Sequence, residues 1–457
     1  MYRKTAYNIS YKKLPVQWLN KALCFVSSSV VANSFRLRNC QLLVIAKHYV
    51  QLKQINNMRD KIKIFTLSFM LFSITVFGQS NRRQLIVSLY PFIPNSDNFY
   101  RKIELEFEKQ NHDIDLIVNL NADYYDESTG LISEEADVYE LDCILLKDFV
   151  QKGKIQSLQP DKFLFQKDDL MPASKIVYLD KKLFAVPHWL CVNFLFYNSL
   201  DSAMQNIKKL SDLENVIGIN PNLKGGLLID LKGRLTLGEL YADALFDQYK
   251  DVDVVKKYTS ISSLDKSAIN NLNRVPKMTF SNWGRIDDYH NKVGFYQKQF
   301  AKANGRAFVG YSESLFYILD EINNSCYNEE GCIPNNQISI TEFPLSENGS
   351  TQVGWVDALA LDSKLTGQKL NDATTFINFM ISKESYHSAL IPDFGSSPRY
   401  LLPAYHRFYN DCLVLQNAPY YKQLYPLALK IISFTEIGIS PDLRQIGKKL
   451  DKEYLKN

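Results

Sequence analysis

The sequence predicts an α/β protein whose main body forms two lobes. Short apolar segments alternate with amphipathic segments of helical length, which favours a parallel sheet with helices on both faces. The 457 residues allow about three compact units, and no repeat or Gly/Ser-rich linker divides them. With 46% hydrophobic and 22% charged residues, the composition excludes collagen, low-complexity disorder and multispan membrane proteins.

The predicted elements follow in order from residue 85. Short, mostly apolar segments predict strands at Leu85–Leu89, Ile114–Val118, Val138–Leu141, Leu183–Pro187, Val192–Tyr197, Ala307–Val309 and Val353–Leu361. Helical periodicity predicts helices at Phe99–Gln110, Leu145–Lys152, Leu235–Tyr249, Asn291–Ala303 and Asp372–Ile381. Two apparent crossovers, at His188–Cys191 and Val353–Trp355, predict one lobe from 84–190 with 354–400 and a second from 191–353 with 401–457. Because ligands of open α/β sheets bind beyond the carboxyl ends of the strands, we expect the site in the cleft between these lobes.

The amino terminus has the layout of an export signal. Arg59, Lys61 and Lys63 precede the apolar stretch Ile64–Phe77, and Gly78 is a small residue before a cut at Gln79. A membrane anchor is the alternative, but the stretch is shorter than the ~20 residues that a spanning helix needs. We therefore predict a signal peptide at 58–78 and a secreted or periplasmic protein. Residues 1–57 are then expected to be a non-native or unstructured extension, with a transit peptide as the alternative.

Charge is divided unevenly along the chain. Removing the 12 basic residues and one acidic residue of 1–78 from totals of 53 and 49 leaves 41 and 48 in 79–457, a net charge of −7. An acidic body lacks the basic footprint of a nucleic-acid-binding protein, so no nucleic-acid partner is expected.

Five cysteines follow the signal, and an odd number in an exported protein indicates at least one free thiol. Cys326 and Cys332 flank YNEEG in a polar loop. The sequence does not decide whether they form a small disulfide or remain two free thiols.

Common catalytic motifs are missing from the sequence. It contains no GxGxxG, Walker loop, HExxH or paired CxxC, and the nucleophile-elbow-like GYSES at Gly310–Ser314 lacks its last glycine. Cys191, between two apolar segments, is by default a small buried hydrophobic residue. A functional role requires a partner that takes the thiol proton, and Glu313 is the candidate base; otherwise it is a solvated loop carboxylate.

Six stretches are specific enough to indicate a family: LYPFIPN (Leu89–Asn95), LDCILLKDFVQKG (Leu141–Gly153), VPHWLCVNFLFYN (Val186–Asn198), NLKGGLLIDLKG (Asn222–Gly233), GRAFVGYSES (Gly305–Ser314) and RYLLPAYHRFY (Arg399–Tyr409). Through them, residues 84–457 resemble bacterial thiaminase I (thiamine pyridinylase), a secreted enzyme on the scaffold of type II periplasmic binding proteins. The resemblance implies a two-lobed α/β fold of that type.

The resemblance also assigns roles to individual residues. Cys191 falls on the family's nucleophile and Glu313 on its general base and acid. The residues that match its substrate-binding positions are Tyr90, Tyr125, Asp142, Tyr311, Trp355 and Asp357, with Tyr124 as the alternative to Tyr125 and Trp355 replacing a family tyrosine.

The implied reaction displaces the thiazole of thiamine with an amine, pyridine or thiol through a covalent Cys191 adduct. Thiamine and a small nucleophile are the expected partners, no metal or organic cofactor is needed, and the exported protein is expected to be a monomer without stable membrane association. A non-catalytic periplasmic protein that binds thiamine or a related pyrimidine for a transporter is the alternative, because a fold alone does not decide function.

Overall fold

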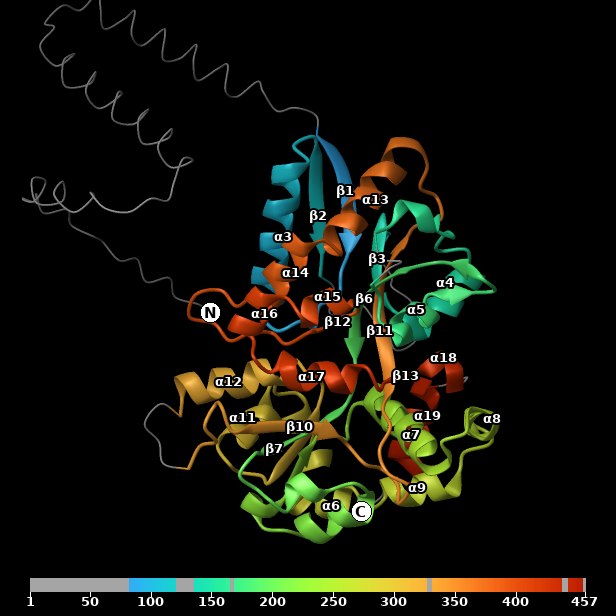
Figure 1. The fold of residues 1–457 in the computed structure, drawn as a ribbon. Helices are drawn as coiled ribbons and strands as arrows, with labels where there is room; N and C mark the ends of the chain where they lie inside the picture. Colours follow the sequence, from blue (N-terminus) through green and yellow to red (C-terminus); the bar gives the residue numbers. More distant parts are fainter. Residues whose placement is uncertain (1–81, 121–134, 165–167, 327–330, 438–442, 455–457) are drawn as a thin grey trace, which may run out of the picture. The chain divides into compact units, whose positions relative to one another are not determined.

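Two β-sheets form the framework of the protein (Figure 1). In the computed structural model, the larger sheet has seven strands in the order β12-β6-β11-β3-β1-β2, with β13 beside β11, and the smaller sheet has the order β10-β7-β9-β8. Strands of the larger sheet are β1 (Arg83–Ser88), β2 (Ile114–Asn119), β3 (Val138–Asp142), β6 (Val186–Cys191), β11 (Val353–Leu361), β12 (Leu402–Pro403) and β13 (Ile432–Ser433). Those of the smaller sheet are β7 (Phe194–Asn198), β8 (Leu227–Ile229), β9 (Ala307–Gly310) and β10 (Ile338–Glu342), and a separate hairpin is formed by β4 (Tyr178–Leu179) and β5 (Lys182–Leu183).

The structure describes residues 82–120, 135–164, 168–326, 331–437 and 443–454, which belong to the compact unit Asn81–Asn457. The predicted extension at 1–57 and signal peptide at 58–78 lie outside this described part. Within it, every helix is too short or too polar to cross a membrane.

The helices form where the sequence presents an apolar face. They are α3 (Ser96–Gln110), α4 (Leu146–Gln151), α5 (Met171–Ile176), α6 (Leu210–Ile217), α7 (Arg234–Tyr249), α8 (Val252–Val255), α9 (Lys266–Leu272), α10 (Asp287–His290), α11 (Phe295–Ala301), α12 (Ser314–Asn324), α13 (Gly367–Met380), α14 (Lys383–Leu390), α15 (His406–Tyr409), α16 (Cys412–Asn417), α17 (Tyr421–Ala428), α18 (Phe434–Ile437) and α19 (Leu443–Lys449). Helix α3 shows the principle, because its buried Phe99, Ile103 and Phe107 recur every four residues and face the sheet.

The expectation of a purely parallel sheet is wrong for the larger sheet. β1 runs parallel to β2 and β3, but β11 runs antiparallel to both β3 and β6. All nine residues of β11 are buried, so this long central strand reads as an apolar run whichever way it points. Its direction therefore could not be deduced from its pattern.

Two local predictions are also corrected. His188–Cys191 does not interrupt a strand but forms most of β6, because His188 is fully buried and its ring nitrogen meets Glu140. The helix predicted at Asn291–Ala303 is shorter, since Gly294 at φ +73° starts α11 only at Phe295.

Two short strands bear on the predicted lobe boundaries. β12 pairs with β6 and β13 pairs with β11, so both lie in the larger sheet although their residues fall in the segment 401–457 predicted for the second lobe.

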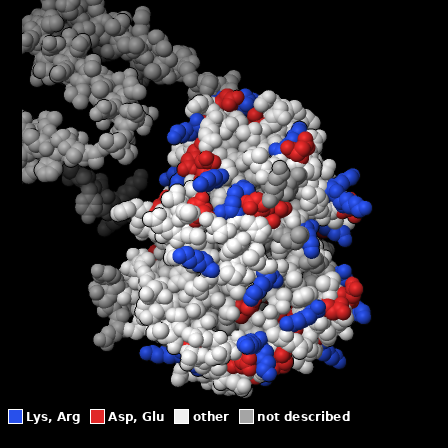
Figure 2. Space-filling view, viewed as in Figure 1, with Lys and Arg blue, Asp and Glu red and all other residues white. Residues whose placement is uncertain are grey.

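On the face shown in Figure 2, basic and acidic side chains of the described residues are interspersed.

Candidate active site

Cys191 lies where the chain passes from one sheet to the other. It is the last residue of β6 in the larger sheet, and β7 of the smaller sheet begins three residues later at Phe194. The Cys191 side chain is half-buried, and its strand neighbour on β11 is Trp355. A thiol at this position can meet groups carried by both sheets.

Two aspartates from neighbouring strands face this thiol. Cys191 Sγ donates a hydrogen bond to Asp357 Oδ2 at 3.4 Å, and Asp357 on β11 stands in register with Asp142 at the end of β3. Both aspartates are buried. Asp142 Oδ1 also accepts a hydrogen bond of 2.9 Å from the backbone N–H of Ile144, which fixes the carboxylate at the start of the next helical turn.

Burial changes the acidity of both carboxyl groups. Desolvation raises the pKa of Asp142 to about 6, against a lowering by its hydrogen bond from Ile144 and by the charge of Arg444. The pKa of Asp357 is raised well above its usual range by desolvation and then by the charge of Asp142. Two such close carboxyl groups favour retention of a proton in the empty site, and a bound cation would favour its release.

Glu313 adds a third carboxyl group from the smaller sheet's side. It follows β9 and directly precedes α12, and desolvation raises its pKa to about 7. The pKa of the Cys191 thiol is raised well above its usual range by desolvation and then by the charges of Asp357 and Glu313. Glu313 is thus close enough to influence the thiol, although the hydrogen bond from Cys191 goes to Asp357.

Aromatic side chains complete the surroundings. The pKa of Tyr90 is raised far above its usual range by burial and by the charges of Asp357 and Cys191, so its phenol remains a neutral donor. Tyr90 is fixed through its backbone, whose N–H donates to Glu140 at 3.0 Å and whose carbonyl accepts from Tyr100 at 2.8 Å.

The other predicted aromatic residues are placed as follows. Tyr311 donates a hydrogen bond to Glu239, and the buried ring of Trp355 stacks on Phe434 with a centroid distance of 4.9 Å. Tyr125 and its alternative Tyr124 lie outside the described residues.

Two supporting acids were not identified from the sequence. Glu239 on α7 is buried, and desolvation raises its pKa to about 8 while the hydrogen bond from Tyr311 lowers it. The sequence does contain a pattern that could have identified Glu239, because Glu239, Asp243 and Asp247 recur every four residues along one face of α7. Asp243 and Asp247 accept backbone hydrogen bonds from the segment 345–353 that leads into β11, so this acidic face positions the strand that carries Asp357.

Glu140 is the second missed acid. Its Oε1 lies 2.5 Å from His188 Nδ1, both side chains are fully buried, and its other oxygen accepts the Tyr90 backbone hydrogen bond. A single histidine within an apolar run gave no sign of this pair, because its partner lies 48 residues away.

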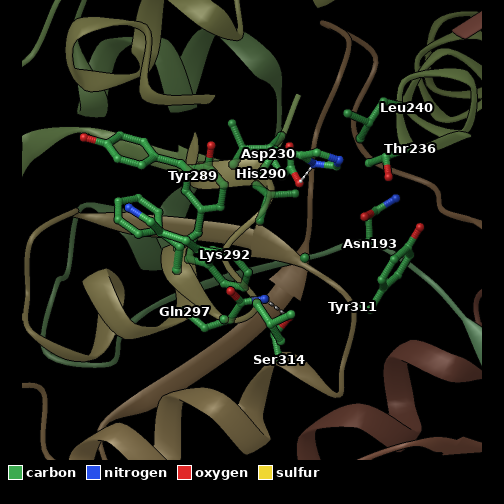
Figure 3. A pocket seen from close by; sticks show the side chains of 18 residues that line it. Asn193, Asp230, Thr236, Leu240, Tyr289, His290, Lys292, Gln297, Tyr311 and Ser314 are labelled. Carbon is green, nitrogen blue, oxygen red and sulfur yellow. Dashed lines mark hydrogen bonds and ion pairs between the residues drawn. The ribbon is translucent and has the colours of Figure 1, made fainter. Parts of the chain in front are cut away.

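Helix α12 begins beside Glu313 and makes a side-chain contact near each of its ends. The partners lie in α11 and in the residue that follows α11. Near its start, Gln297 Nε2 donates to Ser314 Oγ at 3.2 Å, and near its end Lys302 pairs with Glu321 at 2.8 Å. Figure 3 shows the first of these contacts on the wall of a neighbouring cavity. The first of these contacts ties the start of α12, next to Glu313, to α11.

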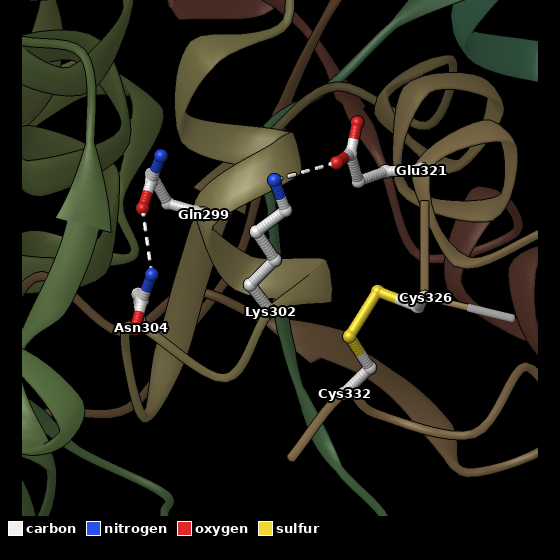
Figure 4. The surroundings of a disulfide bond; sticks show 6 residues. All are labelled: Gln299, Lys302, Asn304, Glu321, Cys326 and Cys332. Atoms are coloured by element: carbon white, nitrogen blue, oxygen red, sulfur yellow. Dashed lines mark hydrogen bonds and ion pairs between the residues drawn. A yellow bond between two sulfur atoms is a disulfide. The ribbon is translucent and has the colours of Figure 1, made fainter. Parts of the chain in front are cut away.

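Cys326 and Cys332 form a disulfide just beyond α12 (Figure 4). Their Cα atoms lie 5.9 Å apart, and the bond closes the polar loop whose pairing the sequence left open. Among the described cysteines, Cys143, Cys191 and Cys412 are free, which confirms the expectation of a free thiol.

The cluster as a whole is acidic and aromatic. Asp142, Asp357 and Glu313 surround one thiol, and Tyr90 and Trp355 lie beside them. Such surroundings suit a cationic, planar ligand through charge attraction and cation–π contact. No group of three His, Cys, Asp or Glu side chains with metal-binding geometry occurs in the described ranges.

Comparison with known proteins gives this geometry a family context. The model of the Thiaminase-1 domain matches residues 192–328, which start directly after Cys191 and include Glu313. The chain is also 26% identical over 351 residues to Thiaminase-1 of Paenibacillus thiaminolyticus. This alignment covers 74% of this chain and 80% of that relative. The resemblance to thiaminase I expected from the six sequence stretches is confirmed.

Solved structures agree on the fold. Clostridium botulinum thiaminase I in complex with thiamin superposes with a TM-score of 0.67 at 24% identity, over 81% of this chain and 100% of that one. Maltose-bound MalE3 of T. maritima gives a TM-score of 0.59 at 14% identity, over 81% and 95%. The predicted α/β fold of type II periplasmic binding proteins is therefore confirmed.

Proposed function

We propose that this protein is a thiamine pyridinylase, a transferase that degrades thiamine by exchanging its thiazole for another nucleophile. The observation that carries the proposal is the half-buried Cys191 thiol surrounded by Asp357, Asp142 and Glu313 within a chain that contains a Thiaminase-1 domain. Two of the proteins named above are thiaminases, and the Clostridium botulinum one is in complex with thiamin.

The charges of the site fit the substrate. Thiamine carries a permanent positive charge on its thiazolium ring, joined through a methylene to an aminopyrimidine. In the empty site, burial and nearby carboxylates keep the Cys191 thiol protonated. A bound cation offsets those negative charges and lowers the cost of forming the thiolate, so the nucleophile becomes active when the substrate arrives.

Glu313 is then the general base. Its pKa of about 7 lies near physiological pH, where a carboxylate is both available and basic enough to accept the thiol proton. The sulfur forms a bond to the pyrimidine carbon next to a ring nitrogen, and the electron pair pushed into the ring breaks the bond between methylene and thiazole nitrogen. The thiazole leaves with that electron pair as a neutral molecule.

The second half of the reaction restores the enzyme. The lone pair of an amine, pyridine or thiol forms a bond to the exocyclic methylene, the carbon–sulfur bond breaks, and its electrons return to Cys191. The proton held by Glu313 returns to the thiolate, while an amine or thiol nucleophile releases its own proton to solvent. One carboxyl group thus serves first as base and then as acid.

The aspartates and tyrosines hold the substrate in this scheme. Asp142 and Asp357 bind the aminopyrimidine and the cation, and Tyr90, Tyr311 and Trp355 line the site, as does Tyr125 by resemblance. The site occupies the cleft between the two predicted lobes, since the chain changes sheet beside Cys191 and again before β11. We propose the lobe boundaries predicted from the sequence, with Leu402–Pro403 and Ile432–Ser433 assigned to the first lobe because they pair with β6 and β11.

The protein acts after export, as a monomer without stable membrane association. The predicted signal at 58–78 and the acidic body support this part of the proposal. Amino-terminal sequencing of protein recovered from the exported fraction tests it, because cleavage leaves Gln79 as the first residue.

Product analysis tests the reaction itself. The protein is incubated with thiamine and aniline, and the mixture is analysed by mass spectrometry. We expect free thiazole and an aniline-substituted pyrimidine. Recovery of intact thiamine that co-purifies with the protein would instead indicate the transporter-type binding protein.

A further inference from the structure

A separate cavity of about 180 Å³ lies next to the proposed active site. Its lining residues come mainly from the end of β8, the first turns of α7, the segment from α10 into α11, and β9 with the residue after it, and Figure 3 labels several of them. Asn193 and Tyr311 line it, two residues after Cys191 and two residues before Glu313. The cavity therefore touches the chain segments that carry the nucleophile and its base.

The other end faces solvent. His290, Lys292 and Val293 line it, and the Val293 side chain is 77% exposed. The cavity is therefore open to solvent next to the end of α10.

One wall of the cavity is aromatic. Tyr289 and Phe295 both line it and stack on each other, with ring centroids 4.0 Å apart and an angle of 13° between the planes. Trp283 packs against both rings, with centroid distances of 5.2 Å to Tyr289 and 5.6 Å to Phe295. The ring edges and faces that this cluster leaves free can pack against another planar ring.

The charge of this cavity differs from that around Cys191. In the described part of the chain, its acidic lining residue is Asp230, whose Oδ2 pairs with His290 Nδ1 at 2.8 Å, and Lys292 lines the same side. The carboxylate of Asp230 raises the pKa of His290, which favours a charged pair that is neutral overall. Because the Asp230–His290 pair is neutral overall and Lys292 adds a positive charge, these surroundings disfavour a thiazolium cation and accept a neutral ligand.

We propose that this cavity binds the incoming nucleophile as a neutral planar nitrogen compound, such as an aromatic amine or a pyridine. Its volume is below the ~300–1,000 Å³ of sites that enclose drug-sized ligands, so it fits a single ring rather than two-ring thiamine. The proposal rests on the thiaminase function, since a covalent intermediate on Cys191 needs a second substrate to reach it after the thiazole has left.

Two variants test the cavity. Val293→Trp narrows the mouth with an exposed side chain that leaves the core unchanged, and Tyr289→Leu removes the stacking wall. We expect each to raise the KM for aniline by about three- to tenfold, the size of one lost aromatic contact, with an unchanged Kd for thiamine. Tyr178→Leu, in the distant β4–β5 hairpin, is the matched control and should change neither value.

Direct binding separates this proposal from the reaction. Saturation-transfer NMR of aniline with the Cys191→Ser protein, which needs no turnover, should give a signal that both cavity variants weaken. If the wild-type protein does not cleave thiamine, the proposed function fails. The NMR measurement still shows whether the cavity binds aniline. Equal weakening of thiamine and aniline would assign the cavity to the thiazolium and overturn the proposal, as would no effect on either ligand.

Discussion

Glu313→Gln distinguishes the general base from the groups that bind substrate. The amide keeps the shape of the side chain but cannot take the thiol proton. We expect kcat to fall by ~10²–10⁴, the usual contribution of a positioned base, with thiamine affinity nearly unchanged.

The pH dependence gives this prediction its magnitude. With the Glu313 pKa at about 7, about half of the enzyme carries the basic form at pH 7 and about a tenth at pH 6. The wild-type rate should therefore fall about fivefold between pH 7 and pH 6, and about tenfold for each further pH unit below 6. A glutamate with an ordinary pKa of about 4.3 would leave the rate flat over that range.

The assay is thiamine consumption with saturating pyridine between pH 5 and pH 8.5, for the wild type and for Glu313→Gln. Pyridine carries no N–H proton, so the profile reports enzyme groups and the ionisation of pyridine itself, which a second nucleophile of different basicity separates. If Glu313→Gln keeps a near wild-type rate and the same acid limb, Asp357, which accepts the thiol hydrogen bond, is the base instead.

The remaining predictions concern binding and stability. Asp142→Asn and Asp357→Asn should weaken binding of thiamine and of an inert thiamine analogue by calorimetry; normal affinity without turnover would reverse their roles with Glu313. Because the Glu239 pKa is raised to about 8, its protonated form contributes stability below pH ~4.5 that is lost as pH rises through about 8, so Glu239→Gln should lose less Tm than wild type between pH 5 and pH 9. An equal loss would show that Glu239 does not titrate in this range. Cys326→Ser with Cys332→Ser should lower the free energy of unfolding by about 2 kcal/mol in urea titrations, the entropy of closing a loop this short, and an unchanged midpoint would contradict that value.

Much of the fold could be predicted from local patterns. β11 begins and ends where its apolar run does, and α7 matches its predicted helix to within one residue at its start. Strand direction could not be predicted, because a fully buried strand such as β11 has the same composition in a parallel or antiparallel position.

Only part of the candidate site could be predicted from the sequence. The motifs brought Cys191 and Glu313 together, but not the hydrogen bond from Cys191 to Asp357. That contact depends on the register of β11 against β6, which shifts between Asp357 and Ala358. Such an irregularity arises from pairing between distant segments, and neither strand alone records it.

Glu140 and His188 illustrate the same limit. The sequence predicts a crossover at His188–Cys191, but the structure has most of strand β6 there. The buried partner of His188, Glu140, lies on β3, and only the folded sheet brings the two side chains to 2.5 Å.

Trapping the intermediate on Cys191 tests the central claim most directly. The protein is mixed with thiamine without added nucleophile, quenched in acid, digested and analysed by mass spectrometry. We predict that the peptide containing Cys191 gains the mass of the pyrimidinylmethyl group, that aniline removes this mass, and that Cys191→Ser neither gains it nor consumes thiamine. Consumption of thiamine with an unmodified Cys191 peptide, or at the wild-type rate in Cys191→Ser, would contradict the mechanism.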